Sequence, residues 1–441
     1  MAHALDRPAS FFSLDQETFS NHTLNLWNWI VLGAPLWWVL GLNLMIYHLA
    51  ALFLFLRMAL FCGRQDRGIF LPTSCFFIFV LILTYLVSII IHASAFPASR
   101  VVASFYNLTF WMMGLLLIVV MANSFPVSKI PFFLKTFSAL AWMMGLLGGI
   151  MFVVGFYARH AVIFSTPLSG LSRYVENADL LMQSVSVPLL IEDWFASFLH
   201  LRFNALSPYP TATGGLLMMI LMMILTSAAM ENRSQRPLFI LLFALNFFAL
   251  LMTLSRMSVL VFVLSLAIVF LLQQRRAFFW TVLLLSVVVF AGPWILKIMD
   301  VIWGLRQGSS ETRFALYQYS LQELEGADWI LGLGIKDRGA AFIFPIGSHS
   351  TYVSLCVKSG IVGLSTFLLF QISLLHRWFQ LRDLAILKQT TFCFWRGLGW
   401  IFFAMAIWTM TEDLDAPQLV AFLYFSLVGV FEGMQRELSQ Q

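Results

Sequence analysis

The stretch NLWNWIVLGAPLWWVLGLNLMIYHLAALFLFLRMALFC, residues 25–62, contains no Asp, Glu or Lys and a single arginine, Arg57. A helix needs about 20 mainly apolar residues to cross the hydrocarbon layer of a membrane. This stretch is about twice that long and is divided near GLN (41–43). It therefore predicts two membrane-spanning helices joined by a tight turn.

The rest of the chain has the same character. Of its 441 residues, 60% are hydrophobic and 11% are charged, whereas soluble domains are about half apolar and about a quarter charged. This composition predicts a polytopic membrane protein. The basic residues are dispersed over short loops, which gives no support to a nucleic-acid partner. The four cysteines form no C-x-x-C pair, so neither a disulfide framework nor a thiolate metal site is indicated.

Ten further apolar runs have lengths suited to membrane-spanning helices. We therefore expect an all-α polytopic membrane protein over residues 1–441, a single membrane-embedded domain with about 12 transmembrane helices and both termini on one side. The ten runs are 69–92, 105–124, 136–158, 212–230, 237–254, 256–273, 278–296, 351–374, 391–410 and 418–434.

The short loops predict the orientation of these helices, because cytoplasmic loops are enriched in Lys and Arg. With the amino terminus in the cytoplasm, the inner loops contain 11 basic residues and the two short outer loops contain one. The chain start also lacks the features of a cleavable signal peptide. We expect both termini to be cytoplasmic. The inner loops are 63–68, 128–135, 231–236, 273–276 and 376–388, and the outer ones are 94–100 and 412–418.

This orientation places two long loops outside the cytoplasm, at residues 160–210 and 298–349. Both mix apolar, aromatic and charged residues, as in LLIEDWFASFLHLRF (189–203). That mixture favours short amphipathic helices at the membrane surface. Long structured loops on one face of a bundle commonly carry function, so we expect the active site in the second loop.

Several basic residues lie at this outer face, where the orientation bias does not account for them. Arg256, in TLSR, lies at a tight turn between two helices. It could extend to lipid phosphates, but the other outer basic residues favour an inward-facing anion ligand. For Arg202, an ion pair with Glu192 or Asp193 is an equal alternative to anion binding. For Arg313, the equal alternative is an ion pair with Glu311 or Glu323. The outer group is Arg202, Arg256, Arg313, Lys336, Arg338 and His349.

His349 lies in GSHSTYV, which predicts the start of a helix capped by Ser348 or Ser350. Tyr352 is three residues further and is expected on the same face. The positive end of a helix disfavours imidazolium, so His349 should be neutral near pH 7 and able to accept a proton. Lys358, deeper in the same helix, could snorkel, pair with a carboxylate or line a cavity.

Some activities lack support in the sequence. It contains neither G-x-x-x-x-G-K-[ST] nor H-E-x-x-H, so nothing indicates nucleotide hydrolysis or a metal centre. The outer face also offers no ATP. Chemistry there would need a donor that is already activated and delivered in the membrane.

Three stretches together resemble the bacterial O-antigen ligase and O-antigen polymerase superfamily. In order they are TLSRMSVLVFVLSLAIV (253–269), TRFALYQYSLQELEGADWILGLGI (312–335) and GSHSTYVSLCVKSGIVGL (347–364). The layout of about twelve helices with a large outer loop before the tenth also matches. Two departures are SPYPTATGG after Arg202, where the family has a proline–asparagine turn, and Lys358, where an acidic residue is common.

The resemblance implies a glycosyltransferase without metal or other cofactor, which uses an undecaprenyl-diphosphate-linked glycan donor and a glycan acceptor. Catalytic residues would be His349 as the base, with Arg256 and Arg313 on the diphosphate, and the reaction would invert the anomeric carbon. Arg202, Arg338, Lys336 and Tyr352 would bind substrate. The expected location is the bacterial inner membrane with the active face toward the periplasm, and a chain-length regulator would be a further partner.

Three functions stay open at this point. A polymerase joins lipid-linked units into O-antigen, capsule or exopolysaccharide, and it is preferred because nothing in the sequence marks a docking surface for lipid A-core. A ligase, which transfers the finished glycan to lipid A-core or another acceptor, would need the same donor site. A transporter or flippase for an anionic lipid-linked substrate is the alternative of a different class. The absence of inverted repeats and the position of the charges at the outer face weigh against it.

Overall fold

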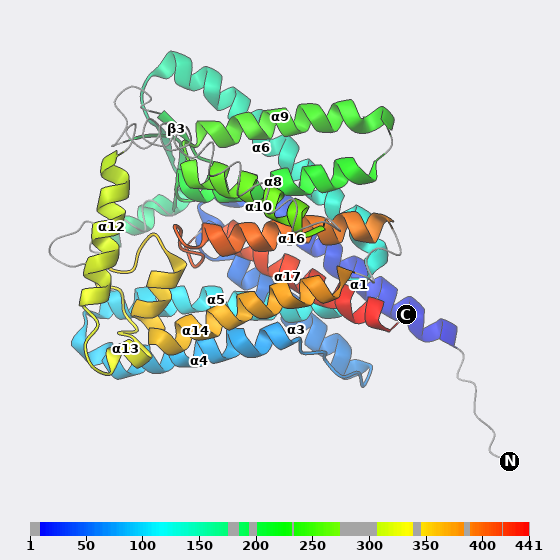
Figure 1. Cartoon of the computed structure of the whole chain (residues 1–441), viewed down its shortest axis with the longest axis horizontal. Coiled ribbons are helices and arrows are strands. Elements are labelled where there is room, and N and C mark those ends of the chain that lie inside the picture. Colours follow the sequence, from blue (N-terminus) through cyan, green and yellow to red (C-terminus); the bar gives the residue numbers. More distant parts are fainter. Residues whose placement is uncertain are drawn as a thin grey trace.

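The computed structural model describes residues 9–174, 185–193, 201–231, 233–273, 307–337, 345–382, 389–416 and 418–440. Within them the chain is mostly helical, and its long helices run side by side in one bundle (Figure 1). The long helices are α1 (Ala9–Leu32), α3 (Ile46–Arg64), α4 (Thr73–His92), α5 (Ala98–Ser124), α6 (Ile130–Ala158), α8 (Pro210–Met230), α9 (Arg236–Met252), α10 (Arg256–Gln273), α14 (Thr351–Gln380), α16 (Gln389–Trp408) and α17 (Gln418–Ser439).

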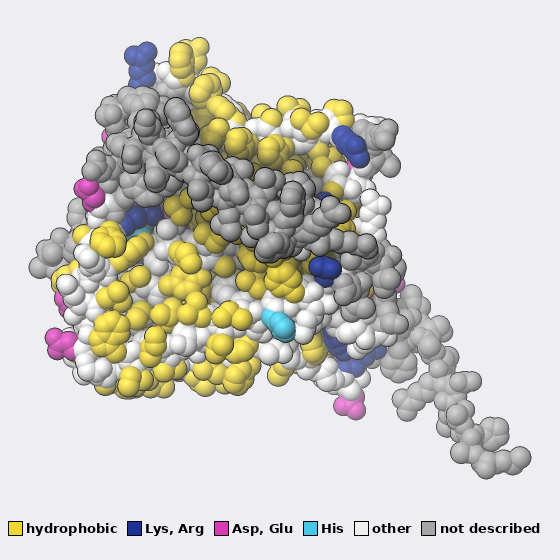
Figure 2. Space-filling view, viewed as in Figure 1, with side chains coloured by type: hydrophobic (Ala, Val, Ile, Leu, Met, Phe, Trp, Pro, Cys, Tyr) yellow, Lys and Arg dark blue, Asp and Glu magenta, His cyan; other side chains and the backbone are white. Residues whose placement is uncertain are grey.

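The surface of the bundle is that of a membrane protein. Helix α3, for example, exposes an apolar stripe at helical spacing, at Leu49, Phe53, Leu56 and Leu60. Figure 2 shows apolar side chains over the middle of the visible face and charged side chains mainly toward its two ends. Exposed apolar residues in such a band are suited to contact with lipid rather than water.

Eight described helices are long and apolar enough to cross a membrane, and α9 and α10 are shorter apolar helices. Each agrees with a run predicted above, which confirms a polytopic helical protein. The predicted span 278–296 lies outside the described residues, so the count of about 12 stays a prediction. The turn in residues 25–62 is confirmed: the short helix α2 (Ala34–Val39) is followed by Gly41, whose φ of 76° ends it before η1 (Leu42–Leu44). Helix α1 begins at Ala9, well before residue 25.

Helix α17 lies in the interior of the bundle. In its most apolar 18-residue window, 94% of the residues are buried, against 33% for α3. Gly429 permits the close approach of α5, because a Cβ there would lie 2.7 Å from the carbonyl oxygen of Ile118. The carboxyl-terminal end of α17 lies at the same end of the bundle as the start of α1 (Figure 1).

The first long loop, residues 160–210, differs from its prediction in the part that the structure describes. It contains a three-stranded antiparallel sheet of β1 (Val162–Ser165), β2 (Ser186–Glu192) and β3 (Leu201–Phe203). The 3₁₀ helix η4 (Pro167–Tyr174) lies between β1 and β2 in the chain. Strand β2 is central, with Leu190 opposite both Val162 and Phe203. Amphipathic helices over residues 189–192 and 201–203 were therefore the wrong prediction, and the chain is not entirely α.

The second long loop contains short helices as predicted, α12 (Gln307–Gln322) and α13 (Asp328–Leu331). They lie with the sheet at one end of the bundle, opposite the end where α1 begins and α17 finishes (Figure 1). Short connections complete the fold: η2 (Ala93–Ala95), η3 (Val127–Lys129) and η5 (Arg233–Gln235). The candidate site lies at the end that carries α12, α13 and the sheet.

Candidate functional site

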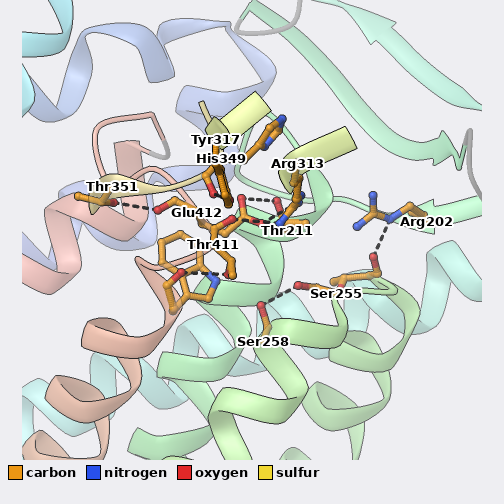
Figure 3. Close-up of polar contacts among 12 residues, drawn as sticks. Arg202, Thr211, Ser255, Ser258, Arg313, Tyr317, His349, Thr351, Thr411 and Glu412 are labelled. Atoms are coloured by element: carbon orange, nitrogen blue, oxygen red, sulfur yellow. Dashed lines mark hydrogen bonds and ion pairs between the residues drawn. The ribbon is translucent and has the colours of Figure 1, made fainter. Parts of the chain in front are cut away.

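Helix α12 places Arg313 and Tyr317 against the segment that precedes α14. The two residues are four apart and share one face with Ser320. The hydroxyl of Tyr317 donates to the carbonyl oxygen of His349, and the amide of Gly347 donates to Ser320 Oγ at 2.7 Å. The predicted short helix with Arg313 is therefore confirmed, and it packs beside His349 (Figure 3).

His349 lies just outside α14, not in its first turn. Its φ is 66°, a left-handed conformation that is unusual for a residue other than glycine. The N-cap is Ser350, whose side chain accepts from the amide of Val353 at 3.3 Å. The shared face with Tyr352 was therefore a wrong prediction. The hydroxyl of Tyr352 instead donates to the carbonyl oxygen of Ala406, on α16, at 2.8 Å.

The His349 side chain is neutral at physiological pH. Burial, with the positive charges of Arg313 and Lys336, lowers its pKa from 6.5 to about 3. This agrees with the predicted neutral imidazole, although neighbouring cations and burial cause it. The same effect shows that the structure brings His349, Arg313 and Lys336 into one electrostatic environment.

An acidic loop between α16 and α17 neutralises three of the basic residues. Arg313 Nη2 lies 3.1 Å from Glu412 Oε1, and Lys336 Nζ lies 2.9 Å from Asp413 Oδ2. Lys358 pairs with Asp415. The sequence shows these carboxylates in EDLDAPQ (412–418), and sequence reasoning used that loop only for its lack of basic residues. The available signal was an acidic cluster on the same side as unexplained cations.

These ion pairs lie in a water-poor environment. Lys336 is 7% exposed and Glu412 is 1% exposed. Burial lowers the pKa of Lys336, opposed by Asp413, and burial raises the pKa of Glu412, opposed by Arg313. Unpaired charges would be costly in such a place, so an anion entering the site would meet cations that already have internal partners.

Thr351, the first residue of α14, holds the acidic loop. Its hydroxyl donates to the carbonyl oxygen of Glu412 at 2.8 Å and accepts from the amide of Leu414 at 2.9 Å. Its own amide donates to the carbonyl oxygens of Thr409 and Glu412, at 2.9 and 3.1 Å. The backbone of the loop is thereby attached to the start of the helix that follows His349 (Figure 3).

Arg202 lies on β3 and contacts the turn that precedes Arg256. Its Nε donates to the carbonyl oxygen of Thr253 at 2.9 Å, and it lies 3.9 Å from Asp193 Oδ2. The alternative partner Asp193 is thus confirmed. Arg256 is the first residue of α10, after a turn in which Leu254 has a φ of 52°. In Figure 3 the guanidinium group of Arg202 points from β3 toward the side where Arg313 and Thr211 lie.

Other predicted residues have the following positions. Arg313 pairs with Glu412, so the proposed ion pair within its own loop was not the one found. Lys358 is fully buried, pairs with Asp415 and lies 5.6 Å from the ring centre of Tyr85, so pairing with a carboxylate is the confirmed alternative. Arg338 lies outside the described residues.

Two glycine-rich segments meet beside the site. Helix α14 breaks at Ser359 and Gly360, and the backbone of α13 and its Gly-Leu-Gly turn packs into the break. Leu333 N donates to the carbonyl oxygen of Val357 at 2.7 Å. A Cβ on Gly360 would lie 2.1 Å from the carbonyl oxygen of Ile330, so the two backbones pack closely at this glycine. The turn leads directly to Lys336.

Among the described residues, no group of three or more His, Cys, Asp or Glu side chains is arranged to hold a metal ion. The sequence does contain one D-x-D, at residues 413–415, so the expectation that this motif is absent was wrong. Its two carboxylates are the partners of Lys336 and Lys358. They serve here as counter-charges within the protein.

Comparison with known protein families gives a match over part of the chain. A family profile described as O-antigen ligase matches residues 241–368. This range includes Arg256, Arg313, Lys336 and His349, whereas Arg202 and the acidic loop lie outside it. No curated protein matches the chain. The match over these residues supports the resemblance to the O-antigen ligase and O-antigen polymerase superfamily.

Proposed function

We propose that the protein is a membrane glycosyltransferase that transfers a glycan from a polyprenyl diphosphate carrier, undecaprenyl diphosphate in a bacterial inner membrane, at the periplasmic face. The family match supports glycan transfer of the ligase or polymerase type. We prefer a polymerase, which joins lipid-linked units into a surface polysaccharide, over a ligase. The active site would lie in the second outer loop, residues 298–349, and at the start of α14.

The observation that carries this proposal is the joint environment of His349, Arg313 and Lys336. Two cations and a neutral imidazole lie together, and the pKa of the imidazole responds to both cations. Arginine has a planar group that suits phosphate oxygens, and a neutral imidazole can accept a proton. A reaction that expels a diphosphate and deprotonates a hydroxyl needs both kinds of group.

The low pKa of His349 fits this role once the donor is considered. With a pKa of about 3, the imidazole of the free site is a weak base. A diphosphate beside Arg313 and Lys336 would cancel their positive field and raise the pKa, because an adjacent anion favours the protonated ring. The site would therefore gain a base when the donor binds.

For this proposed reaction we infer the following bond changes. An acceptor hydroxyl oxygen attacks the anomeric carbon, and its proton passes to His349. The bond from that carbon to the diphosphate oxygen breaks, and the polyprenyl diphosphate leaves beside Arg313 and Arg256. Each well-placed donor to the developing charge contributes about 3–4 kcal/mol to the rate. Arg202 would act by holding the turn before Arg256, while Lys336, Arg338 and Tyr352 would contribute to substrate binding.

The test is glycan transfer in membranes that contain the full chain, lipid-linked donor and acceptor. His349→Ala should lower transfer by about 10²–10⁴-fold, the range for loss of a general base, with normal insertion and yield. The matched control is His376→Ala, an exposed histidine near the far end of α14, the helix that follows His349, which should keep full activity. Full activity of His349→Ala would remove this residue from the chemistry.

Deletion in the native host distinguishes the two kinds of enzyme. Loss of a polymerase leaves single repeat units, either still linked to the lipid carrier or attached singly to the acceptor. Loss of a ligase leaves long polymer that is not attached. Gel analysis of surface glycan separates these outcomes, and an unchanged glycan pattern would contradict both.

A further inference from the structure

Glu412 occupies a position where an anion binds well. Its Oε2 accepts from the hydroxyl of Thr211 at 2.8 Å, and its Oε1 lies 3.1 Å from Arg313 Nη2. Thr211 is the second residue of α8, so the carboxylate sits at the amino-terminal, positive end of a 21-residue helix. A guanidinium, a hydroxyl and a helix amino terminus together are the groups that bind phosphate in many proteins.

Arg313 and the backbone of Glu412 are also held by contacts that do not involve the Glu412 carboxylate. Arg313 Nη1 also donates to the carbonyl oxygen of Thr411 at 3.0 Å, which holds the guanidinium independently of the Glu412 side chain. Thr351 holds the Glu412 backbone through the carbonyl oxygen. The side chain of Glu412 could therefore rotate away while its backbone, Arg313 and Thr211 stay in place.

The neighbouring carboxylates have other positions. Asp413 and Asp415 pair with Lys336 and Lys358, and neither contacts Arg313 or Thr211 in the described contacts. Glu412 alone among the three lies between the arginine and the helix terminus. A phosphate group of a donor that binds Arg313 would need the space and hydrogen-bond donors that Glu412 uses.

We propose that Glu412 is an internal substitute for a donor phosphate. Its carboxylate fills the oxyanion position between Arg313 and Thr211 while the site is empty, and it swings out when the diphosphate binds. This inference rests on the proposed function for the identity of the ligand. It adds that the free enzyme is held in a self-inhibited state by its own carboxylate, and that donor binding must displace it.

The experiment measures binding of inorganic pyrophosphate to the full-length protein in lipid nanodiscs by calorimetry. Glu412→Gln removes the competing charge and keeps the shape of the side chain. We expect it to bind pyrophosphate at least about tenfold more tightly than the unmodified protein, since a charge-assisted hydrogen bond contributes about that factor. Glu412→Asp, which withdraws the carboxylate by one methylene, should give a smaller gain.

The matched control is Glu432→Gln. Glu432 is also a buried carboxylate paired with an arginine, Arg377, but on the distant half of α17. It should leave pyrophosphate binding unchanged. A parallel rise in affinity in this control would mean that only net charge matters, and it would overturn the proposal.

Equal or weaker binding by both Glu412 variants would also overturn it, and the aspartate variant decides the matter if the glutamine variant does not fold. If the Glu412 proposal is overturned but the unmodified protein transfers glycan and His349→Ala does not, the proposed function still stands. Absence of pyrophosphate binding in every variant would reject the oxyanion position. If transfer were also absent, the proposed function would fail with it.

Discussion

His349 shows how single residues of the site depend on partners far away in the sequence. Its backbone has a left-handed conformation, which costs about 1–3 kcal/mol unless neighbours compensate. Tyr317 donates to its carbonyl oxygen, and Ser320 accepts from Gly347 two residues earlier. Both partners come from α12, so the position of this imidazole depends on the docking of that helix.

Acid should destabilise the protein through His349. Between pH 6.5 and about 3, the unfolded chain binds a proton at this residue and the folded protein does not. Stability therefore falls as the pH is lowered through this window, by about 1.4 kcal/mol per pH unit at most. We expect the Tm of the unmodified protein to fall more steeply than that of His349→Gln over this range. Identical slopes for the two proteins would contradict the prediction.

The sequence identified the basic half of the site and missed the acidic half. Arg313 on a short helix and the serine cap near His349 follow from local patterns of a few residues. Glu412 is 99 residues from Arg313, and no local periodicity joins them. Only their charges and a shared side of the membrane could have suggested the pairing. Long-range partners of this kind depend on how the helices pack.

At the scale of elements, the contact between α13 and the break in α14 fixes the position of the turn that leads to Lys336. The amide of Leu333 uses the carbonyl oxygen of Val357, and Ser88 on α4 donates to the carbonyl oxygen of Gly332 at 2.8 Å. Three elements thereby meet through backbone atoms. Glycine is required where their backbones approach.

Gly360→Ala should disrupt this contact. The new Cβ would lie 2.1 Å from the carbonyl oxygen of Ile330, and the φ of 60° is unfavourable for alanine. We expect a loss of about 2 kcal/mol or more in stability, seen as a lower Tm, together with loss of glycan transfer. Gly149→Ala, in α6 with nothing within 4 Å of its Cβ position, is the control and should be neutral within about 1 kcal/mol. An equal Tm for both variants would show that α13 does not dock this closely.

The three-stranded sheet in the first long loop could not be predicted from sequence patterns at this scale. Residues 189–203 mix apolar and charged side chains in a way that favours a surface helix. In the structure, Leu190 and Phe203 pair across β2 and β3 and are both fully buried. Pairing between separate segments decides such a short strand, and a three-residue strand such as β3 carries too little pattern to predict.

At the scale of the molecule, hydropathy predicted which segments are helices but not where each one lies. Runs as apolar as α3 and α17 differ widely in burial, because α17 packs inside the bundle and α3 faces outward. The glycines of α17 at its contact with α5 are a sequence feature that could have indicated its burial. Composition alone does not separate lipid contact from helix contact, since both favour apolar side chains.

The final prediction concerns the side of the membrane on which the site lies. Asp66, between α3 and α4, and Glu325, between α12 and α13, are both exposed, and Figure 1 places these connections at opposite ends of the bundle. The four native cysteines are buried, so they should give little background labelling. In spheroplasts, a membrane-impermeant maleimide should label Glu325→Cys directly and Asp66→Cys only after the membrane is permeabilised. The excess of basic residues in the predicted inner loops is the physical reason. The reverse pattern would place Arg313 and His349 in the cytoplasm, and transfer at the periplasmic face would then be excluded.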